Sequence, residues 1–184
     1  MWRKFCTWFL NKVLGWTVDG PMPEDRVCVI LGVPHTSIWD MAIAYFYYTS
    51  VGGKARVMIK KEAFFWPVGP LLKSMGAIPI DRKNPAALVA NIISTMKDSE
   101  TFHLAICPEG TRKAVTRWKT GYHTIATKVG CPVYLGYFDW KTKHIGCGKK
   151  FELSSDARED TEKIKEIYES MHLTGKYPEK YITK

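Results

Sequence analysis

The sequence lacks any uninterrupted apolar run of about 18 residues, so we expect no helix that spans a membrane. It also lacks the pattern of a cleavable signal peptide, because Asn11 and Lys12 interrupt the apolar part of the N-terminal segment. No internal repeat and no low-complexity tract occurs along the chain. The sequence therefore predicts neither a membrane-spanning protein nor a repeat architecture.

Cysteines are few and follow no metal-binding pattern. The chain has five, none of which forms a CxxC pair: Cys6, Cys28, Cys107, Cys131 and Cys147. Three of them, Cys28, Cys107 and Cys131, lie in or beside apolar segments. We interpret the cysteines as small buried side chains in a reducing compartment, and we expect no metal site.

The chain has more positive than negative charge. It carries 27 Lys and Arg residues against 18 Asp and Glu residues, a formal net charge of +9. Such a charge predicts attraction to an acidic partner: nucleic acid, anionic lipid or an acidic carrier protein. The length of 184 residues and the hydrophobic content of 46% predict one domain with a substantial core.

The N-terminal segment has the pattern of an amphipathic helix. Its apolar stripe contains Trp2, Phe5, Cys6, Phe9, Leu10, Val13 and Leu14, and mostly polar or basic residues lie opposite. Two interpretations are open, a helix lying in the membrane interface and a terminal helix docked on the domain. We favour the first because Trp8 broadens the apolar stripe. We therefore predict an amphipathic membrane-surface anchor over residues 1–20 and a main domain over residues 21–184.

Strand-like and helix-like segments alternate after the turn-rich residues 20–23. We expect strands at Val27–Val33, Ala55–Ile59, Ala77–Ile80, His103–Cys107 and Val133–Phe138. We expect helices at Ile38–Tyr48, Glu62–Ser74, Pro85–Asp98, Tyr122–Val129 and Ser155–His172. The alternation predicts a single α/β domain with a largely parallel or mixed central sheet flanked by helices, plus the N-terminal amphipathic helix.

A histidine and an aspartate five residues apart, His35 and Asp40, follow the first predicted strand of the main domain. On one ideal helix this spacing would point them roughly 140° apart, so they meet only if His35 precedes a helix whose first turn holds Asp40. A neutral imidazole can take a proton from a hydroxyl, and a carboxylate can fix its tautomer. We predict that His35 is a general base oriented by Asp40.

Two further loops after predicted strands carry charged residues. One contains Arg82, and the other contains Glu109, Gly110, Thr111 and Arg112; Lys60 ends another strand. Since loops at the carboxyl ends of strands carry the chemistry of open α/β sheets, these cations could line an anion pocket beside the base. The alternative is ordinary strand-exit turns with Glu–Arg and Asp–Arg ion pairs.

Taken in order, four segments resemble the lysophosphatidic acid acyltransferase family within the glycerolipid acyltransferases. They are His35 to Asp40, Gly76-Ala77-Ile78-Pro79-Ile80-Asp81-Arg82, Pro108-Glu109-Gly110-Thr111-Arg112 and Cys131-Pro132-Val133-Tyr134-Leu135. The resemblance covers roughly residues 27–140. Three positions depart from the family pattern, Pro34, Pro79 and Lys113. These departures bear on the acceptor more than on the reaction class.

The resemblance implies transfer of a fatty acyl group from an acyl thioester to the hydroxyl of a lysophospholipid, most simply lysophosphatidic acid. It implies His35 and Asp40 as the catalytic pair, with no covalent enzyme intermediate and no bound cofactor. Residues near the acceptor would be Lys60, Arg82, Glu109, Gly110, Thr111 and Arg112. The acyl donor would be acyl-CoA or an acidic acyl-carrier protein.

We accordingly expect an enzyme associated with an anionic membrane at its cytoplasmic face, and no nucleic-acid partner. Two alternatives stay open at this point. One is acylation of a different lyso-lipid, such as a lyso-aminolipid. The other is a catalytically silent protein that binds lipid or acyl-carrier protein.

Overall fold

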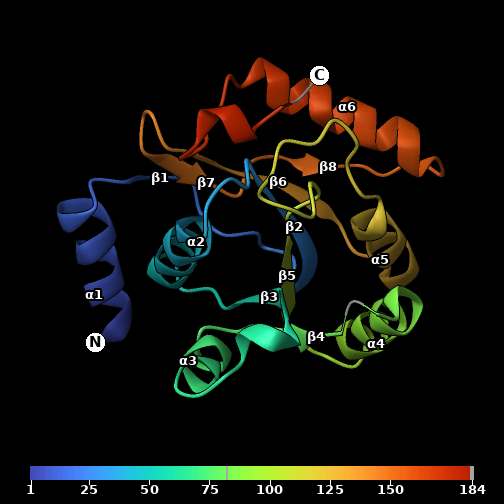
Figure 1. The fold of residues 1–184 in the computed structure, drawn as a ribbon, viewed down its shortest axis with the longest axis horizontal. Coiled ribbons are helices and arrows are strands. Elements are labelled where there is room, and N and C mark those ends of the chain that lie inside the picture. The colour runs from blue at the N-terminus through green and yellow to red at the C-terminus, as the bar shows by residue number, and fades with distance from the viewer. Residues whose placement is uncertain (82, 183–184) are drawn as a thin grey trace.

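A mixed, mostly parallel eight-stranded β-sheet organises the computed structural model, which describes residues 1–81 and 83–182 (Figure 1). The strands are β1 (Thr17–Asp19), β2 (Val27–Val33), β3 (Ala55–Lys60), β4 (Ala77–Ile80), β5 (Phe102–Ile106), β6 (Val133–Asp139), β7 (His144–Gly146) and β8 (Lys150–Phe151). Their order across the sheet is β1-β7-β6-β2-β5-β3-β4, and β8 pairs with β6. The predicted fold class is confirmed.

The central strand β2 determines where the loops of the domain meet. It pairs in parallel with β5 on one side and with β6 on the other. The sheet continues in parallel from β5 to β3 and β4, whereas β7 and β8 run antiparallel to β6. The carboxyl ends of β2, β3, β4, β5 and β6 therefore lie along one edge of the sheet, where open α/β sheets carry their functional loops.

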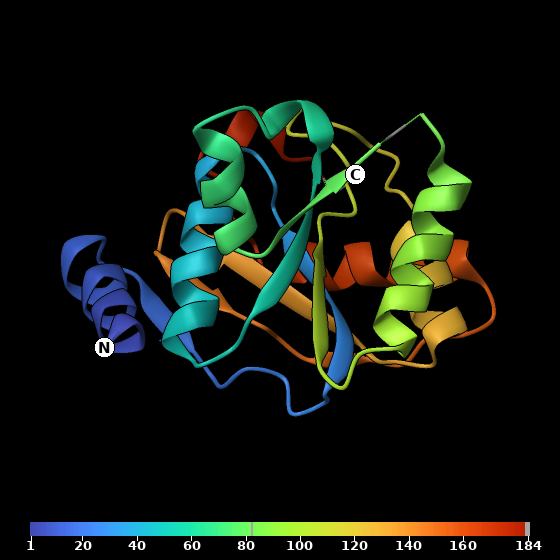
Figure 2. The same cartoon turned by 90° about the horizontal axis from the view of Figure 1, so that it is seen from below.

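Helices cover both faces of the sheet. The α-helices are α1 (Trp2–Trp8), α2 (Trp39–Ser50), α3 (Val68–Ser74), α4 (Pro85–Lys97), α5 (Gly121–Val129) and α6 (Ala157–Ser170). Figure 2 shows α2 and α3 on one side of the sheet and α4 and α5 on the other. The α4 helix begins as the sequence predicts, with Pro85 in its first turn and the Asn84 side chain accepting a hydrogen bond from the Ala87 N–H.

Alternating residues of β2 pack into two hydrophobic cores. Val29, Leu31 and Val33 pack into a cluster with side chains of α4, α5 and α6, including the fully buried Met96. Ile30 joins a second cluster on the α2 side. Because both faces of β2 are buried, the strand has the continuous apolar sequence that is typical of a central parallel strand.

The N-terminal helix is shorter than residues 1–20. After α1 a π-helical segment, η1 (Phe9–Val13), completes it, and β1 then joins the sheet through β7. Cys6 and Leu10 are fully buried, whereas Trp2 and Trp8 are each 54% exposed. One side of the segment is therefore docked on the domain and the other is open to solvent. Within the described part of the chain, no helix combines the length and apolar character that crossing a bilayer requires.

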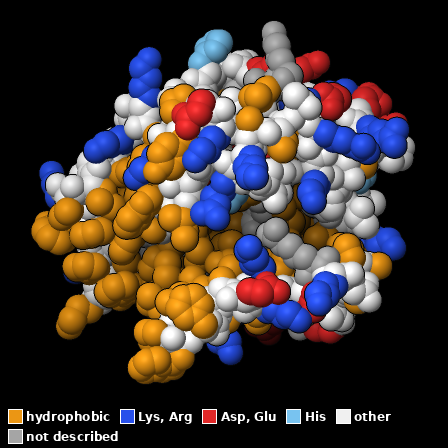
Figure 3. Space-filling model, viewed as in Figure 1, with side chains coloured by type: hydrophobic (Ala, Val, Ile, Leu, Met, Phe, Trp, Pro, Cys, Tyr) orange, Lys and Arg blue, Asp and Glu red, His pale blue; other side chains and the backbone are white. Residues whose placement is uncertain are grey.

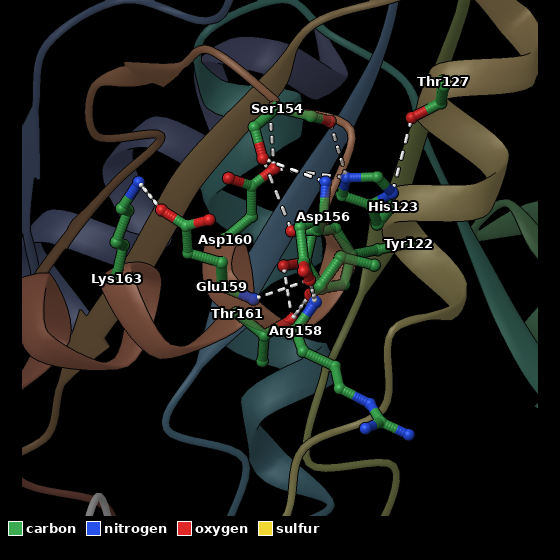
Figure 4. A network of polar contacts seen from close by, with 11 residues as sticks. Tyr122, His123, Thr127, Ser154, Asp156, Arg158, Glu159, Asp160, Thr161 and Lys163 are labelled. Carbon is green, nitrogen blue, oxygen red and sulfur yellow. Dashed lines mark hydrogen bonds and ion pairs between the residues drawn. The ribbon is translucent and has the colours of Figure 1, made fainter.

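A buried polar network joins α5 to α6 (Figure 4). The His123 Nε2 lies 3.1 Å from the Asp160 carboxylate and 3.1 Å from the Ser154 carbonyl oxygen. Both partners are acceptors, so Nε2 donates the hydrogen bonds. The Asp160 carboxylate also accepts a bond of 2.7 Å from the Ser154 N–H. This network holds the first turn of α6 against α5, far along the chain from the His35 loop.

The structure differs from the sequence predictions in its short elements. The strands β1, β7 and β8 were not predicted, and the helix expected over Glu62–Ser74 is divided. A 3₁₀ turn, η2 (Lys61–Ala63), precedes α3, and Pro67 lies between the two segments. A further 3₁₀ turn, η3 (Pro178–Lys180), lies near the C-terminus.

Candidate active site

His35 and Asp40 meet in the way that their spacing predicts. His35 lies in the loop that follows β2, and Asp40 lies in the first turn of α2. The His35 Nδ1 is 3.2 Å from the Asp40 Oδ2. The His35 side chain is 24% exposed, whereas the Asp40 side chain is 2% exposed. The imidazole is therefore accessible to a substrate, and the carboxylate behind it is shielded from water.

Asp40 is held by three donors besides the imidazole. Its Oδ2 accepts hydrogen bonds from the Thr36 N–H at 2.8 Å and the Ser37 N–H at 2.7 Å. Its Oδ1 accepts a bond from the Trp140 Nε1 at 2.9 Å. A carboxylate in this setting accepts the His35 Nδ1–H and leaves the lone pair on Nε2, the arrangement that a general base requires.

Two neighbours control protonation of His35. Burial by itself disfavours the imidazolium, but the adjacent Cys107 sulfur and the hydrogen-bonded Asp40 carboxylate outweigh burial and raise the pKa of His35 above its ordinary value. Cys107 directly follows β5 and precedes the third motif, so the start of the loop after β5 lies beside the histidine. The higher pKa makes His35 a stronger base once it has lost its proton.

Glu109 supports the loop of the histidine from behind. Its Oε1 accepts a 2.8 Å hydrogen bond from the backbone N–H of His35, and the residue is only 5% exposed. Burial raises the pKa of Glu109 to about 7, against the opposing effect of the His35 N–H. Among the residues that the structure describes, no group bonds the buried Oε2 of Glu109. Glu109 therefore has one unused acceptor atom, buried behind the His35 loop.

The rest of the third motif forms a tight turn. Gly110 has a φ of +66°, and a Cβ at this position would lie 2.9 Å from the Lys119 side chain. Thr111 is half-buried, and its hydroxyl accepts the Lys113 N–H at 3.3 Å. Arg112 is exposed and faces a small cavity of about 230 Å³ that Thr36 and Ser37 also line. The turn thus brings one cation beside the loop that carries His35.

A larger cavity lies between α2 and the sheet. Its volume is about 620 Å³. It extends from Gly32, three residues before His35, past Met41 and Tyr47 to Lys54 and Gly76 near the opposite end of the strands. Most of its lining residues are apolar, so it can hold a hydrocarbon chain.

The remaining predicted site residues are Lys60 and Arg82. Lys60 is exposed at the end of β3 and lines neither cavity. Its neighbour Lys61 forms an ion pair of 2.6 Å with Asp81. Arg82 lies outside the described residues. In residues 1–81 and 83–182, no group of three or more His, Cys, Asp or Glu side chains is placed to bind a metal ion.

Three residues of the site were not predicted from the sequence. Trp140 follows β6, 100 residues after the aspartate to which it donates a hydrogen bond. The C-terminal residues Tyr177 and Lys180 line the small cavity beside Arg112. Their pattern in the sequence contains no signal of this role, because the contacts exist only after β6 and α6 have packed on the sheet.

Comparison with known proteins identifies a matching family model and a solved structure with a similar fold. Residues 19–135 match the family model described as Acyltransferase. The crystal structure of the 1-acyl-sn-glycerophosphate (LPA) acyltransferase PlsC from Thermotoga maritima is similar, with a TM-score of 0.62 and 17% sequence identity. The likeness covers 93% of this chain and 78% of that one, and at this identity it concerns the fold. No curated protein sequence gives a significant match.

Proposed function

This chain belongs to the acyltransferase family whose model matches residues 19–135, and we propose from this premise that it acylates a lysophospholipid. The acyl donor is a thioester, the best acceptor is lysophosphatidic acid, and the product is phosphatidic acid. The observation that carries the proposal is the His35–Asp40 pair beside the small cavity that Arg112 lines. The relative from Thermotoga maritima, itself described as an LPA acyltransferase, supports the choice of acceptor.

In the proposed reaction His35 Nε2 removes the proton from the acceptor hydroxyl. The oxygen attacks the thioester carbonyl carbon, a tetrahedral intermediate forms, and the thiolate leaves with the proton that the imidazolium returns. The ester bond forms as the thioester bond breaks, and no residue of the enzyme is acylated. Asp40 stabilises the imidazolium and keeps Nδ1 protonated, a role supported by its hydrogen bonds to backbone N–H groups and Trp140.

We assign the acceptor headgroup to the side of the third motif. Arg112 binds the phosphate, for which its guanidinium is suited. The unpaired Oε2 of Glu109 accepts a hydrogen bond from a glycerol hydroxyl. Gly110 and Thr111 shape the turn that presents these groups. Lys60 and Arg82 remain predictions from the family resemblance.

We assign the fatty acyl chain to the larger cavity beneath α2. That cavity extends from Gly32, close to the catalytic histidine, into the second hydrophobic core. A thioester carbonyl at its mouth would have its chain within apolar surroundings. The donor is acyl-CoA or an acyl-carrier protein, and the formal net charge of +9 favours approach of either acidic molecule.

We further propose that the enzyme works at the cytoplasmic face of an anionic membrane. On the face shown in Figure 3, hydrophobic side chains gather over α1, α2 and α3. The exposed fractions are 54% for Trp2, 54% for Trp8, 85% for Trp66 and 60% for Leu71. Aromatic side chains of this kind are suited to the interface between headgroups and acyl chains. A lipid acceptor could then enter without leaving the bilayer surface.

The proposed reaction is tested with purified protein and an isotope-labelled acyl thioester, presented as acyl-CoA and as acyl-carrier protein. The acceptor panel contains lysophosphatidic acid, lysophosphatidylcholine, monoacylglycerol and a lyso-aminolipid, and mass spectrometry identifies the products. Labelled phosphatidic acid as the main product supports the proposal. A lyso-aminolipid product would change the acceptor, and no product with any acceptor would favour a binding protein.

A further inference from the structure

The segment after α6 is hydrogen-bonded to the loop that carries His35. The Tyr177 N–H donates a 3.3 Å hydrogen bond to the Thr36 hydroxyl, directly beside His35 in the chain. Upstream, the Thr174 carbonyl accepts the Trp140 N–H at 2.8 Å. These bonds place residues 174–181 at the site although they lie beyond the part that matches the family model.

Close packing fixes the same segment. A Cβ on Gly175 would lie 2.5 Å from the Thr36 side chain, so that side chain packs directly against the Gly175 backbone and leaves no room for a larger residue. The Lys176 ammonium lies 4.6 Å from the centre of the Trp140 ring and 5.3 Å from that of Trp39. Cation–π contacts at these distances anchor the chain on the α2 side of the cavity.

The small cavity therefore has walls from three separate parts of the sequence. The loop before α2 supplies Thr36 and Ser37, the third motif supplies Arg112, and the C-terminal segment supplies Tyr177 and Lys180. The Lys180 ammonium lies 4.1 Å from the centre of the Tyr177 ring, which steadies the lysine at this wall.

Among the described residues, two cations at this cavity have no acidic partner. Over the part of the chain that the structure describes, neither Arg112 nor Lys180 forms an ion pair with an acidic side chain. The Thr36 hydroxyl accepts the Tyr177 N–H and the Ser37 hydroxyl accepts the Trp39 N–H, so each keeps its own proton to donate. Two positive charges and two hydroxyl donors around about 230 Å³ form a site for a small anion.

We infer that Lys180 of the C-terminal segment binds the phosphate of the acceptor together with Arg112, and makes the enzyme selective for phosphomonoester headgroups. The inference rests on the proposed function. A phosphomonoester carries up to two negative charges near neutral pH, which two monovalent cations match, whereas a phosphodiester carries one. Coenzyme A also has phosphates. We assign the cavity to the acceptor because Thr36, the neighbour of His35, lines it, and His35 must reach the acceptor hydroxyl.

The test compares Lys180→Gln with Lys180→Arg and with Lys128→Gln, which removes an exposed lysine of α5 outside both cavities. For Lys180→Gln we expect kcat/KM for lysophosphatidic acid to fall about tenfold or more through a higher KM. The rates with lysophosphatidylcholine and the KM for the acyl thioester should not change. Lys180→Arg should retain the preference for the phosphomonoester, and Lys128→Gln should behave as the unmodified enzyme.

Three outcomes would overturn the inference: an unchanged KM for lysophosphatidic acid, an equal loss with every acceptor, or a loss confined to the KM of acyl-CoA. The last would assign the lysine to the donor. A second measurement, phosphorus NMR titration with glycerol 3-phosphate, needs no acyl transfer. Weaker binding by Lys180→Gln supports the site even if no lysolipid is acylated, in which case only the proposed reaction fails. Equal binding by Lys180→Gln and the unmodified protein would remove Lys180 from the phosphate site.

Discussion

At the scale of single residues, the hydrogen bonds of Asp40 determine what His35 can do. Its carboxylate is 2% exposed and accepts bonds from two backbone N–H groups, the Trp140 indole and the imidazole. Moving it would break several bonds at once, so the imidazole has one stable orientation. Preorganisation of this kind lowers the cost of forming the imidazolium during catalysis.

Replacement of the carboxylate should therefore be more harmful than loss of one of its donors. In Asp40→Asn the side chain keeps its size but cannot stabilise the imidazolium, and we expect kcat to fall about 10²–10⁴-fold. The matched variant Trp140→Phe removes only the indole N–H bond and should lose far less activity. Steady-state turnover with circular dichroism as the check of folding measures both. Normal turnover by folded Asp40→Asn would contradict the orienting role.

The protonation of His35 should determine how activity depends on pH. Only neutral His35 can accept a proton, so kcat/KM should rise with pH as His35 loses its proton. Because the pKa of His35 is raised, this rising limb should lie above pH 6.5, the ordinary pKa of histidine being about 6.5. Since Cys107 contributes to the higher pKa, Cys107→Ala should move that limb to lower pH.

The control for this profile is Glu109→Gln. Burial raises the pKa of Glu109 to about 7, so ionisation of this carboxyl also lies above pH 6.5 and has to be distinguished from that of His35. Glu109→Gln should keep the rising limb. A limb that disappears in Glu109→Gln, or one that Cys107→Ala leaves in place, would contradict the assignment to His35.

The sequence predicted the contact between His35 and Asp40 but not its surroundings. A spacing of five residues between the end of a strand and the first turn of a helix was enough to bring His35 to Asp40. Trp140 and Lys180 could not be found in this way. Each reaches the site through tertiary packing of elements that are distant in sequence, and neither lies within the four motifs.

At the scale of elements, short strands and divided helices account for most differences from the sequence predictions. The three residues of β1 or β7 are too few to display an alternating pattern, so only the pairing with neighbouring strands defines them. The long strand β2 was predicted closely because seven consecutive apolar or small residues lie between turn signals.

The N-terminal stripe illustrates how one pattern can have two roles. The sequence left a docked helix and a membrane-surface helix as alternatives. In the structure Cys6 and Leu10 are buried against the domain, while Trp2 and Trp8 on the remainder of the stripe are exposed. The apolar stripe is therefore wide enough for one side of it to dock on the domain. The side with Trp2 and Trp8 is free for the proposed contact with lipid.

The network between α5 and α6 should contribute strongly to stability. Asp160→Ala would leave the His123 Nε2–H and the Ser154 N–H without their buried acceptor, and we expect the free energy of unfolding to fall by about 3 kcal/mol. Urea unfolding measures the change.

The control lies in the same network (Figure 4). Lys163→Ala removes an exposed ion pair of 2.6 Å with Glu159, and the urea midpoint should hardly move because water screens that pair. Equal effects of Asp160→Ala and Lys163→Ala would contradict the structural role of the buried network.

At the scale of the whole molecule, the predicted family and fold class are both confirmed. The family model covers His35, Asp40 and the third motif, and the PlsC structure has a similar fold over most of this chain. The first and third motifs follow β2 and β5 at the carboxyl edge of the sheet, whereas the fourth lies at the start of β6. The finer predictions, acceptor, donor and membrane surface, depend on side chains that the family resemblance does not determine.

The apolar face over α1, α2 and α3 should bind membranes. Substituting both Trp2 and Trp8 by Ser keeps the buried Cys6 and Leu10 in place, and we expect binding to anionic liposomes to weaken by about tenfold or more. The control Ile167→Ser changes an exposed apolar side chain of α6 and should leave binding unaltered. Liposome sedimentation measures all three proteins. Unchanged sedimentation of the double variant would contradict the membrane role of α1.

The general-base role of His35 is tested most directly by the turnover of His35→Ala, measured with a labelled acyl thioester and the acceptor that the unmodified enzyme prefers. Circular dichroism and an unfolding curve establish that the variant is folded. We predict that its kcat is about 10²–10⁴-fold lower than that of the unmodified enzyme. A folded His35→Ala enzyme that acylates its acceptor at a near-normal rate would contradict the mechanism.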